Sequence, residues 1–537
     1  MRKRRSLSLV TLVLAAVAVG TAGATTRADV REGGILRLAI AELDYLDPAL
    51  AYGGGSWALL DTTCARLMTY PDKPTPEGSR LVPEVAVDYP KISLNRKTYT
   101  FTVRPGFRFS DGSPVRASAF ARAINRTLAP GIETGALQYT SSIAGAADVQ
   151  AGRSPNAAGV VARGNTLVVR FTRPVADFAA QTTMPFFCAV PPNLPSDPEG
   201  VRTFHSAGPY VITDYRPGER VTIRRNPHYR GSRPHHVDGF DVDLRVDGPQ
   251  DALDRVERGE ADWTTALAPV YFEPGRGLAA KYGVNKSRFF VRPGFILRHI
   301  VFNNARPLFR DNAPLRQAVN FALNRVVLAR TAAPSPLSEI LTDQYLPPSL
   351  PGFRDADIYP LRRPNLQRAR SLARGNVRGG TAVLYSNNAP QPLAVAQAAS
   401  RQLSMLGLKV ELRPLPGSVF LNRIFAEGEP WDMALLLWAP DYVDPFQYTN
   451  LLFDGRPQLS GNAGRFESTT LTPSMRKAAR MRGSARYAAY GDLDVRLARE
   501  GAPSAPISIF AEPTLVSSRV GCIVLRPALD LTAACLK

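Results

Sequence analysis

Short motifs of cofactor, metal and hydrolytic chemistry are missing from the 537 residues of this sequence. We find no phosphate-binding GxxxxGK loop, no HExxH zinc helix, no EF-hand loop and no GxSxG nucleophile elbow. Histidine is scarce, with 5 residues, and the adjacent pair His235-His236 has no further clustered ligand. No pair of carboxylates stands out by its spacing. We therefore expect no cofactor, no metal site and no catalytic residues.

Long apolar runs are also missing from the chain beyond its N-terminus. No later segment reaches the roughly 18 uninterrupted apolar residues of a membrane-spanning helix. The N-terminus itself combines a basic cluster at Arg2–Arg5, an apolar run over about Leu7–Val19 and the small-residue site Ala22-Gly23-Ala24. This order is typical of a secretory signal peptide, which we place at residues 1–24.

The export signal leaves some alternatives open. Cleavage after Ala28 is possible, and Arg4-Arg5 keeps the twin-arginine route open beside the general secretion route that we favour. No Cys lies near the cleavage site, so we expect no lipid anchor. We predict an exported protein of the periplasm or cell envelope that is soluble after cleavage.

Lysine is rare, so most of the 66 Lys+Arg are Arg, and against 46 Asp+Glu they leave a formal net charge of +20. A nucleic-acid-binding protein would gather such charge into a stripe or tail with interleaved aromatic residues. Here Arg is spread along the chain. We therefore expect no nucleic-acid partner, and relate the charge to solubility and to weak attraction to anionic envelope polymers.

Cysteine is limited to 4 residues, all in the exported part. An even number in an oxidising compartment predicts disulfides. Metal binding is the alternative, but it would require CxxC-type spacing, which is absent. Cys522 and Cys535 are close in sequence and predict a local bridge, which leaves Cys64 to pair with Cys188 by elimination.

The overall composition, 45% hydrophobic and 21% charged, is that of a folded protein. One hydrophobic core stops growing near about 250–300 residues, so we expect two or more lobes. Hairpin signals are frequent from about Thr69 to Ser206, whereas the second half alternates strands and helices. There, Ala382–Tyr385, Leu393–Leu406 and Leu408–Leu412 predict a β-α-β unit and hence a parallel sheet covered by helices.

Several single elements can be placed more closely. The apolar run Met433–Trp438 predicts a strand buried on both faces. Apolar residues from Leu315 to Val327 recur at helical spacing and predict one amphipathic helix. Asn365 is predicted to cap a helix over Leu366–Arg374. The Gly-rich residues 53–55 follow no phosphate-loop pattern, and we expect them to let two backbone segments approach closely.

A series of short segments then follows in a definite order. They are Gly33–Leu38, Leu46–Ala49, Leu81–Ala86, Tyr99–Pro114, Gly208–Val211, Pro217–Glu219, Arg225–Pro227, Gly259–Asp262, Phe302–Asn304, Leu315–Arg325 and Trp431–Ala434. Each segment is a weak signal, but the series spans nearly the whole mature chain. It resembles the extracellular solute-binding proteins, family 5, that serve peptide-type ABC importers.

The resemblance implies an α/β, two-lobed fold like that of the large periplasmic peptide-binding proteins, with an extra subdomain inserted in lobe I. This mapping assigns lobe I to residues 29–68, 206–290 and 508–537, the inserted subdomain to 69–205, and lobe II to 291–507. The family further implies a monomer whose lobes close on a peptide and then dock on the permease of an ABC importer in the membrane.

The resemblance also points to ligand-binding residues. Ligands gather at the carboxyl ends of strands in α/β sheets, and Asp441 lies three residues beyond the predicted strand that ends at Trp438. In peptide-binding members the aspartate of a Trp-x-x-Asp-Tyr stretch pairs with the ligand's α-ammonium, and Trp438, Asp441 and Tyr442 match that stretch. Trp438 and Tyr442 are expected to wall the pocket, with core packing as the alternative. Asp444, followed by Pro445, is expected to cap a helix.

Three further positions match family contacts less closely. Glu42 and Leu43 follow the first strand, where a solvated loop is the alternative, and Tyr139 matches an aromatic residue of the inserted subdomain. No basic residue is singled out for the ligand's carboxylate, so dipeptides and longer oligopeptides both remain open. The alternative functions are the same fold binding a nickel complex, an oligosaccharide or another small solute, and more distantly a secreted hydrolase or an envelope-binding protein.

Overall fold

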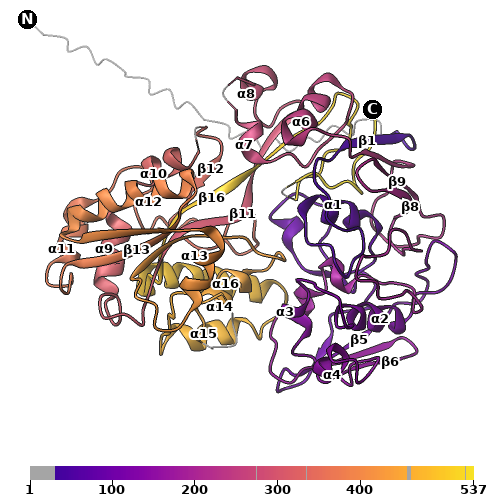
Figure 1. Cartoon of the computed structure of the whole chain (residues 1–537), viewed down its shortest axis with the longest axis horizontal. Helices are drawn as coiled ribbons and strands as arrows, with labels where there is room; N and C mark the ends of the chain where they lie inside the picture. Colours follow the sequence, from indigo (N-terminus) through magenta and orange to yellow (C-terminus); the bar gives the residue numbers. More distant parts are fainter. Residues whose placement is uncertain (1–30, 274, 334, 456–460, 527) are drawn as a thin grey trace, which may run out of the picture.

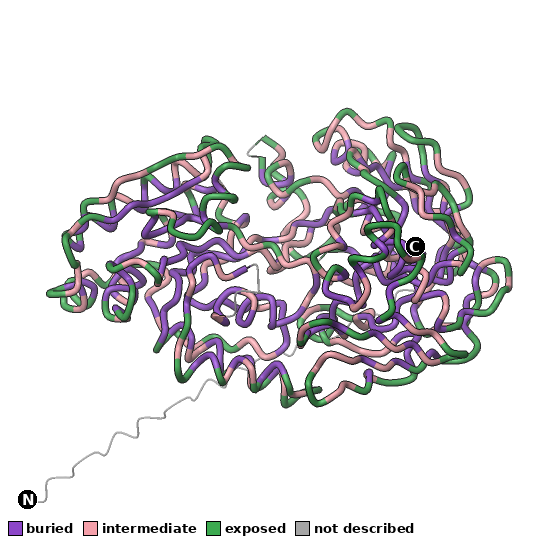
Figure 2. Tube along the Cα trace, turned by 60° about the horizontal axis from the view of Figure 1, so that its bottom comes forward, coloured by how far each residue is buried: buried purple, intermediate pink, exposed green. Residues whose placement is uncertain are grey.

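The computed structural model describes residues 31–273, 275–333, 335–455, 461–526 and 528–537, so the signal peptide expected at residues 1–24 lies outside the described residues. Two lobes lie side by side, joined by strands that run between them (Figure 1). Each lobe has a buried interior and an exposed outer surface (Figure 2). None of the helices in the described ranges is long and apolar enough to cross a membrane.

The first lobe is built on a four-stranded sheet with the order β1-β10-β9-β8. Its strands and accompanying elements are β1 (Ile35–Ala39), α1 (Gly54–Thr63), β2 (Met68–Thr69), β8 (Tyr210–Arg216), β9 (Arg220–Arg225), β10 (Gly239–Asp243), α6 (Gly248–Arg258), α7 (Ala268–Tyr271) and α8 (Leu278–Tyr282). Strand β2 pairs with β3 (Val82–Pro83), which belongs to the inserted subdomain. β1 runs parallel to β10, and the other neighbours are antiparallel. Leu36 and Leu38 of β1 pack in one core with Leu525 and Leu529 of the C-terminal tail, so this core unites both ends of the described chain.

A subdomain inserted into the first lobe has its own sheet, with the order β4-β5-β7-β6. Its elements are η1 (Glu77–Ser79), β4 (Lys91–Ile92), β5 (Thr98–Thr102), α2 (Ala117–Thr127), α3 (Leu137–Thr140), α4 (Ala146–Gln150), β6 (Val160–Arg163), β7 (Thr166–Arg170), α5 (Phe178–Gln181) and η2 (Pro185–Phe187). All its paired strands are antiparallel, as the hairpin signals of this region predict. Phe101 and Phe178 pack in its buried core, against α2 residue Phe120.

The second lobe surrounds a six-stranded sheet with the order β12-β16-β11-β15-β13-β14. Its elements are β11 (Phe289–Phe302), α9 (Ala313–Ala322), α10 (Arg325–Ala332), β12 (Glu339–Leu341), α11 (Leu366–Ala373), β13 (Thr381–Asn387), α12 (Pro390–Leu403), η3 (Ser404–Leu406), β14 (Lys409–Leu415), α13 (Gly417–Phe425), β15 (Met433–Trp438), η4 (Pro445–Gln447), α14 (Asn450–Phe453), α15 (Leu471–Ala478), α16 (Gly483–Arg496), η5 (Leu497–Gly501) and β16 (Ser504–Leu515). Met433 and Leu435 of β15 pack against α9–α12, whereas Ala434 and Leu436 pack against α13. The strand predicted to be buried on both faces is thus confirmed over most of its length, while Leu437 at its end is 44% exposed.

The β-α-β unit predicted in this lobe is confirmed, because β13 and β14 run parallel and α12 connects them. The predicted parallel sheet is confirmed only where β13 pairs with β14 and β15. The sheet as a whole is mixed, since β11 pairs antiparallel with both β15 and β16. The single helix predicted from Leu315 to Val327 is also wrong. The chain breaks at Leu323, and the side chain of Asn324 accepts a hydrogen bond from the Val327 amide to start α10. The Asn365 cap of α11 is confirmed by the same type of bond from Arg368.

Two long strands, β11 and β16, link the lobes. At one end Phe289 pairs with Leu515 in a core shared with first-lobe helix α6, and at the other end Ile300 pairs with Ala505 in the second-lobe core. The register shifts between Pro293 and Leu297, so the ladder is irregular where the strands pass from one lobe to the other. Both connections therefore run through one antiparallel pair.

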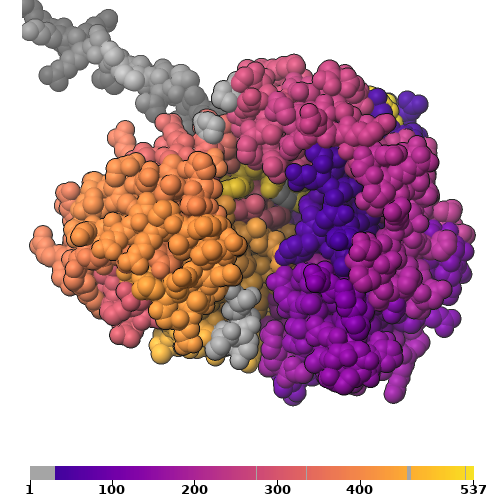
Figure 3. Space-filling model, in the orientation of Figure 1, coloured from indigo at the N-terminus to yellow at the C-terminus, as the bar shows by residue number. Residues whose placement is uncertain are grey.

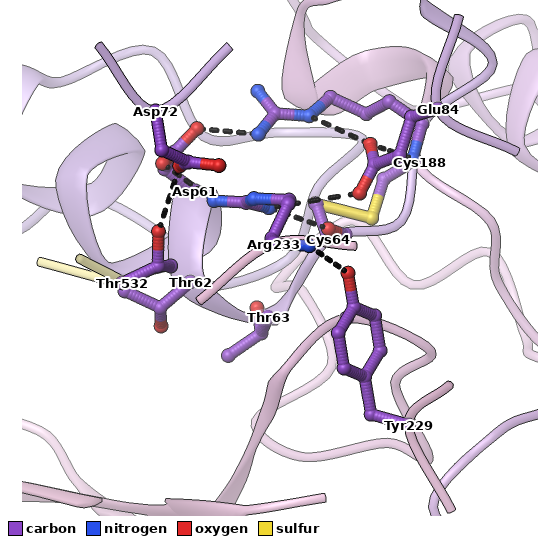
Figure 4. Close-up of polar contacts among 12 residues, drawn as sticks. Asp61, Thr62, Thr63, Cys64, Asp72, Glu84, Cys188, Tyr229, Arg233 and Thr532 are labelled. Carbon is purple, nitrogen blue, oxygen red and sulfur yellow. Dashed lines mark hydrogen bonds and ion pairs between the residues drawn. A yellow bond between two sulfur atoms is a disulfide. The ribbon is translucent and has the colours of Figure 1, made fainter. Parts of the chain in front are cut away.

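The disulfides join Cys64 to Cys188 and Cys522 to Cys535, the pairing expected from the sequence. The Cys64–Cys188 disulfide ties α1 to the end of the inserted subdomain. The Cys522–Cys535 disulfide joins two residues of the C-terminal tail that are 13 positions apart in the sequence. Beside the first bridge lies a buried cluster of charged side chains (Figure 4). Arg233 donates hydrogen bonds to Asp61 at 2.9 Å and to the Cys64 carbonyl at 3.2 Å, and lies 3.8 Å from Glu84.

Candidate ligand-binding cleft

The two lobes face each other across a deep hollow (Figure 3). Where the inserted subdomain approaches the second lobe, the structure has a cavity of about 220 Å³. Its walls come from both sides and include Gln138, Tyr139 and Asp177 of the inserted subdomain and Trp438, Asp441 and Tyr442 of the second lobe. Of the six predicted ligand-binding residues, four therefore line one cavity.

Asp441 follows the end of β15 and faces three neutral donors from the opposite lobe. Its Oδ1 accepts a hydrogen bond from the Tyr52 hydroxyl at 2.7 Å, and its Oδ2 accepts bonds from the Tyr139 hydroxyl and from Gln138 Nε2 at 3.3 Å. No Lys, Arg or His in the described part of the chain forms an ion pair with this carboxylate. Asp441 is therefore an anion stabilised by dipoles alone, at the boundary between the lobes.

The phenols remain donors to Asp441 over the whole physiological range. Burial raises the pKa of Tyr52 to about 12, helped by its hydrogen bond to Asp441 and the charge of that carboxylate. The pKa of Tyr139 is raised as well, by burial first and then by the charge of Asp441. An ammonium group that reached Asp441 would compete with these hydroxyls for the same oxygens and would add the counter-charge that they lack.

Tyr442 lies deeper, 4% exposed, and its hydroxyl donates a hydrogen bond to Asp177. Burial raises the pKa of Asp177, although this bond opposes the shift. The rings of Tyr442 and Tyr139 meet edge to face, with centroids 6.1 Å apart. Tyr442 thus contributes both to the cavity wall and to a polar contact between the second lobe and the inserted subdomain.

Glu42 and Leu43 lie elsewhere. They line a separate hollow of about 380 Å³ together with the Gly-rich residues 53–55 and a segment around Thr264. The interpretation of the glycines as a close approach of two backbones is confirmed at Gly55, where an added Cβ would lie 2.4 Å from the Glu42 carbonyl oxygen. The structure therefore does not bring this loop to the Asp441 cavity.

Asp444 has the capping role expected of it and a second role that the sequence did not reveal. Its Oδ1 accepts a hydrogen bond from the Phe446 amide at 2.8 Å and starts η4. Both carboxylate oxygens also accept bonds from Arg486 of α16, at 2.6 and 2.9 Å. This buried bidentate pair fixes the segment that carries Asp441 to the body of the second lobe.

Sequence reasoning missed Tyr52, Gln138 and Asp177. Tyr52 is separated by 389 residues from the carboxylate that it contacts, and Gln138 by 303 residues. No local pattern encodes such contacts, since they depend on how the two lobes face each other. The Gly-rich run that follows Tyr52 was the one local sign that its backbone adopts an unusual path.

Comparisons with known proteins identify the family and the fold of the chain. The model of the family described as Bacterial extracellular solute-binding proteins, family 5 Middle, matches residues 80–460. The chain is 24% identical over 454 residues to the probable D,D-dipeptide-binding periplasmic protein DdpA of Escherichia coli, covering 82% of this chain and 81% of that protein. It is 24% identical over 385 residues to the oligopeptide-binding protein OppA of Bacillus subtilis, covering 68% of each.

Solved structures show the same fold. Clavulanic acid biosynthesis oligopeptide binding protein 2 matches with a TM-score of 0.79 and 24% identity, covering 94% of this chain and 96% of that one. The periplasmic binding protein DppA of Helicobacter pylori, in complex with the peptide STSA, matches with a TM-score of 0.62 and 18% identity, covering 94% and 98%. Since the family model spans most of the chain, this protein belongs to the bacterial extracellular solute-binding proteins of family 5.

Proposed function

We propose that this protein is an extracytoplasmic receptor that captures peptides between its two lobes and delivers them to the permease of an ABC importer. The observation that carries the proposal is Asp441, an anion at the boundary between the lobes that has three neutral donors and no cationic partner among the described residues. A peptide's α-ammonium supplies the missing charge whatever its side chains are. This suits a receptor that accepts many sequences.

The family and the named relatives support the same function. DdpA and OppA are named for dipeptide and oligopeptide binding, and DdpA is named as periplasmic. We therefore place this protein outside the cytoplasmic membrane, as a monomer that binds peptides without chemical conversion and without a nucleic-acid partner.

We also propose lobe I at residues 29–68, 206–290 and 508–537, the inserted subdomain at 69–205 and lobe II at 291–507. The distribution of the three larger sheets supports this division.

The test is native mass spectrometry of the protein purified from its own cell envelope, compared with the same sample after denaturation and refolding. We expect a heterogeneous set of adduct masses that fragment as peptides and disappear on refolding. Asp441→Asn should reduce binding by about tenfold or more, because a charge-assisted hydrogen bond is replaced by a neutral one.

The matched control is Asp355→Asn, which removes an exposed carboxylate from the same lobe and should retain its cargo. A single discrete adduct, such as a metal chelate or a sugar, would assign this fold a non-peptide solute. Equal peptide loading in Asp441→Asn and Asp355→Asn would show that Asp441 is not the ammonium site.

A further inference from the structure

The outer end of the second lobe carries an excess of positive charge that the protein does not compensate. Between Ile358 and Val410 the sequence has eight basic residues and no Asp or Glu. Within the described ranges none of the eight forms an ion pair with an acidic side chain, and all are exposed. They are Arg362, Arg363, Arg368, Arg370, Arg374, Arg378, Arg401 and Lys409.

Exposed arginines on the sheet side of the first lobe are arranged differently. Arg224 of β9 lies 2.8 Å from Asp241 of β10. Arg258 of α6 lies 2.7 Å from Glu260. These charges are compensated inside the protein, whereas the charges of residues 358–410 remain available to a partner outside it.

The fold gathers much of this charge around helix α11, at the end of the second lobe farthest from the first lobe (Figure 1). Arg370 Nε donates a hydrogen bond to the Met405 carbonyl at 3.3 Å, which holds α11 against η3. Arg374 follows Arg370 by four residues, about one helical turn, and Arg401 precedes Met405 by the same spacing. The ends of α11 and α12 therefore bring their cations to one place.

The starts of strands β13 and β14 add cations to the same end. Arg378, three residues before β13, donates hydrogen bonds to the carbonyls of Pro307 and Arg310 at 2.7 and 2.6 Å. Strand β14 begins at Lys409, which pairs with Thr381, the first residue of β13. We define the outer basic cluster as six exposed residues: Arg310, Arg370, Arg374, Arg378, Arg401 and Lys409.

Two carboxylates adjoin the outer basic cluster. Asp311 follows Arg310 directly, and Glu411 lies two residues beyond Lys409 on β14. Glu411 is already 3.6 Å from Arg413. Among the described residues the six cations thus face one neighbouring carboxylate, Asp311, that has no ion-pair partner.

Helix electrostatics accounts for only part of the cluster. A basic residue in the last turn is favourable at the negative end of a helix, which explains Arg370 of α11 and Arg401 of α12. Arg378 lies in the loop before β13, and Lys409 starts a strand. These two cations gain nothing from a helix dipole, so the excess charge points to a partner.

The side chains around the cations fit a lipid surface and not a nucleic acid. Nucleic-acid binding would require exposed aromatic rings among the cations. The aromatic residues of 358–410 are Tyr359 and Tyr385, which are only 3% and 4% exposed. Met405, whose carbonyl bonds Arg370, is 37% exposed and offers an apolar side chain that can enter the headgroup region of a bilayer. Guanidinium groups bind phosphate oxygens in bidentate fashion.

We propose that the outer basic cluster docks the protein reversibly on the phosphate headgroups of an anionic lipid bilayer. The cluster lies at the outer end of the second lobe, away from the hollow between the lobes, so docking leaves that hollow open (Figures 1 and 3). The inference goes beyond the proposed function, since it depends on the charge of the second lobe and not on the ligand.

The test is co-sedimentation of the full mature protein with vesicles of phosphatidylglycerol and phosphatidylcholine, or of phosphatidylcholine alone. The wild type should bind only the anionic vesicles at about 0.1 M salt and should be released at about 1 M, because the Debye length falls from about 10 Å to about 3 Å. The variant Arg374→Gln/Arg401→Gln/Lys409→Gln should bind about tenfold or more weakly, since each cation near an anionic membrane adds to the attraction. These three side chains have no hydrogen-bond partner within the described ranges, so we expect the variant to fold.

The matched control is Arg116→Gln/Arg163→Gln/Arg202→Gln, which removes three exposed arginines from the inserted subdomain and should bind as the wild type does. Equal binding of the wild type to both kinds of vesicle would overturn the proposal. Equal weakening in the two triple variants would show that net charge, and not this cluster, drives binding. Binding to inorganic polyphosphate in solution, with none to anionic vesicles, would assign the cluster to a soluble polyanion and overturn the lipid partner. Peptide loading should be the same in both variants, so it tests the proposed function separately.

Discussion

Glu512 is an acidic side chain on β16, one of the two strands that link the lobes. Its carboxyl group has no hydrogen-bond partner among the described residues, and burial raises its pKa from 4.5 to about 7. The protonated form is therefore favoured in the folded protein. Because the folded pKa lies above the unfolded one, the contribution of this group to stability is fully present below about pH 4.5 and is lost as the pH rises from there through about 7.

The prediction concerns Glu512→Gln, which is neutral at every pH. Above pH 7 we expect the variant to be more stable than the wild type by about 2 kcal/mol, after allowance for the partial exposure of the side chain. At pH 4 the two proteins should be equally stable. Denaturant unfolding at pH 4, 6 and 8 measures the difference, with the exposed Glu133→Gln as control. A constant difference between Glu512→Gln and the wild type at all three pH values would contradict the prediction.

For single residues of the site, the sequence predicts the carboxylate better than the side chains that donate hydrogen bonds to it. Asp441 could be named because it follows a recognisable buried strand and matches a family stretch. Tyr52 and Gln138 could not, because their hydrogen bonds to Asp441 form between lobes that are far apart in the sequence. Glu42 and Leu43 also matched family positions, though less closely, and the structure places them at another hollow. A local match to the family can single out a residue, but it does not predict which cavity that residue will face.

Among the elements, the pair β11 and β16 depends on one glycine. A Cβ on Gly294 would lie 2.8 Å from the Phe510 carbonyl oxygen and 2.8 Å from Glu512 Cγ, so the strands could not keep their spacing. Gly294→Ala should therefore destabilise the protein by about 1–3 kcal/mol, as overpacked sites do. Gly54→Ala is the control, because an added Cβ there meets no atom within 4 Å. Thermal unfolding of both variants is the measurement, and equal midpoints would refute the assigned role of Gly294.

Most elements of the second lobe were predicted, and the exceptions have a physical cause. The hydrophobic spacing from Leu315 onward suggested one helix because α9 and α10 both bury apolar residues, Leu315 and Leu328 among them, in the same core. The hydrophobic spacing does not reveal the break between α9 and α10. Val327, which the spacing assigned to the buried face, is 44% exposed. Asn324 was the available signal, since it is a good capping residue placed inside the predicted helix.

For the whole molecule, the buried cluster around Arg233 joins segments that are distant in the chain. Arg233 bonds Asp61 of α1 and lies close to Glu84, while Arg526 of the C-terminal tail lies 2.9 Å from Asp530 and 3.5 Å from Asp61. Asp72 completes the group, and burial, followed by its hydrogen bond with Asp530, raises its pKa to about 7. Asp72 is thus partly protonated near neutral pH, which lowers the negative charge that the buried arginines must compensate.

Removing the central cation should be costly. Arg233→Met leaves buried carboxylates without their partner, and we expect a loss of about 3–5 kcal/mol in the free energy of unfolding. Arg230→Met, three residues away and exposed, should be close to neutral. Chemical denaturation of the two variants at pH 7 tests this. Similar losses in both would mean that Arg233 contributes through its hydrophobic stem and not through its charge.

The two-lobed architecture was predictable from chain length and family resemblance, whereas the mixed second-lobe sheet was not. Strand β11 pairs with β16 about two hundred residues later, as in the pairing of Val301 with Ser504. The β-propensity of a segment indicates that it forms a strand, but it does not indicate which distant strand will pair with it.

The core of the first lobe also constrains how the protein is made. Leu36 and Leu38, near the start of the described chain, pack against Leu529 and Leu531 near its end, and Arg31 forms a β-bridge with Leu536. A chain that is synthesised from its N-terminus can therefore complete the second lobe while the first still waits for the last residues to emerge. A chain that lacks these last residues should therefore leave the apolar side of β1 exposed.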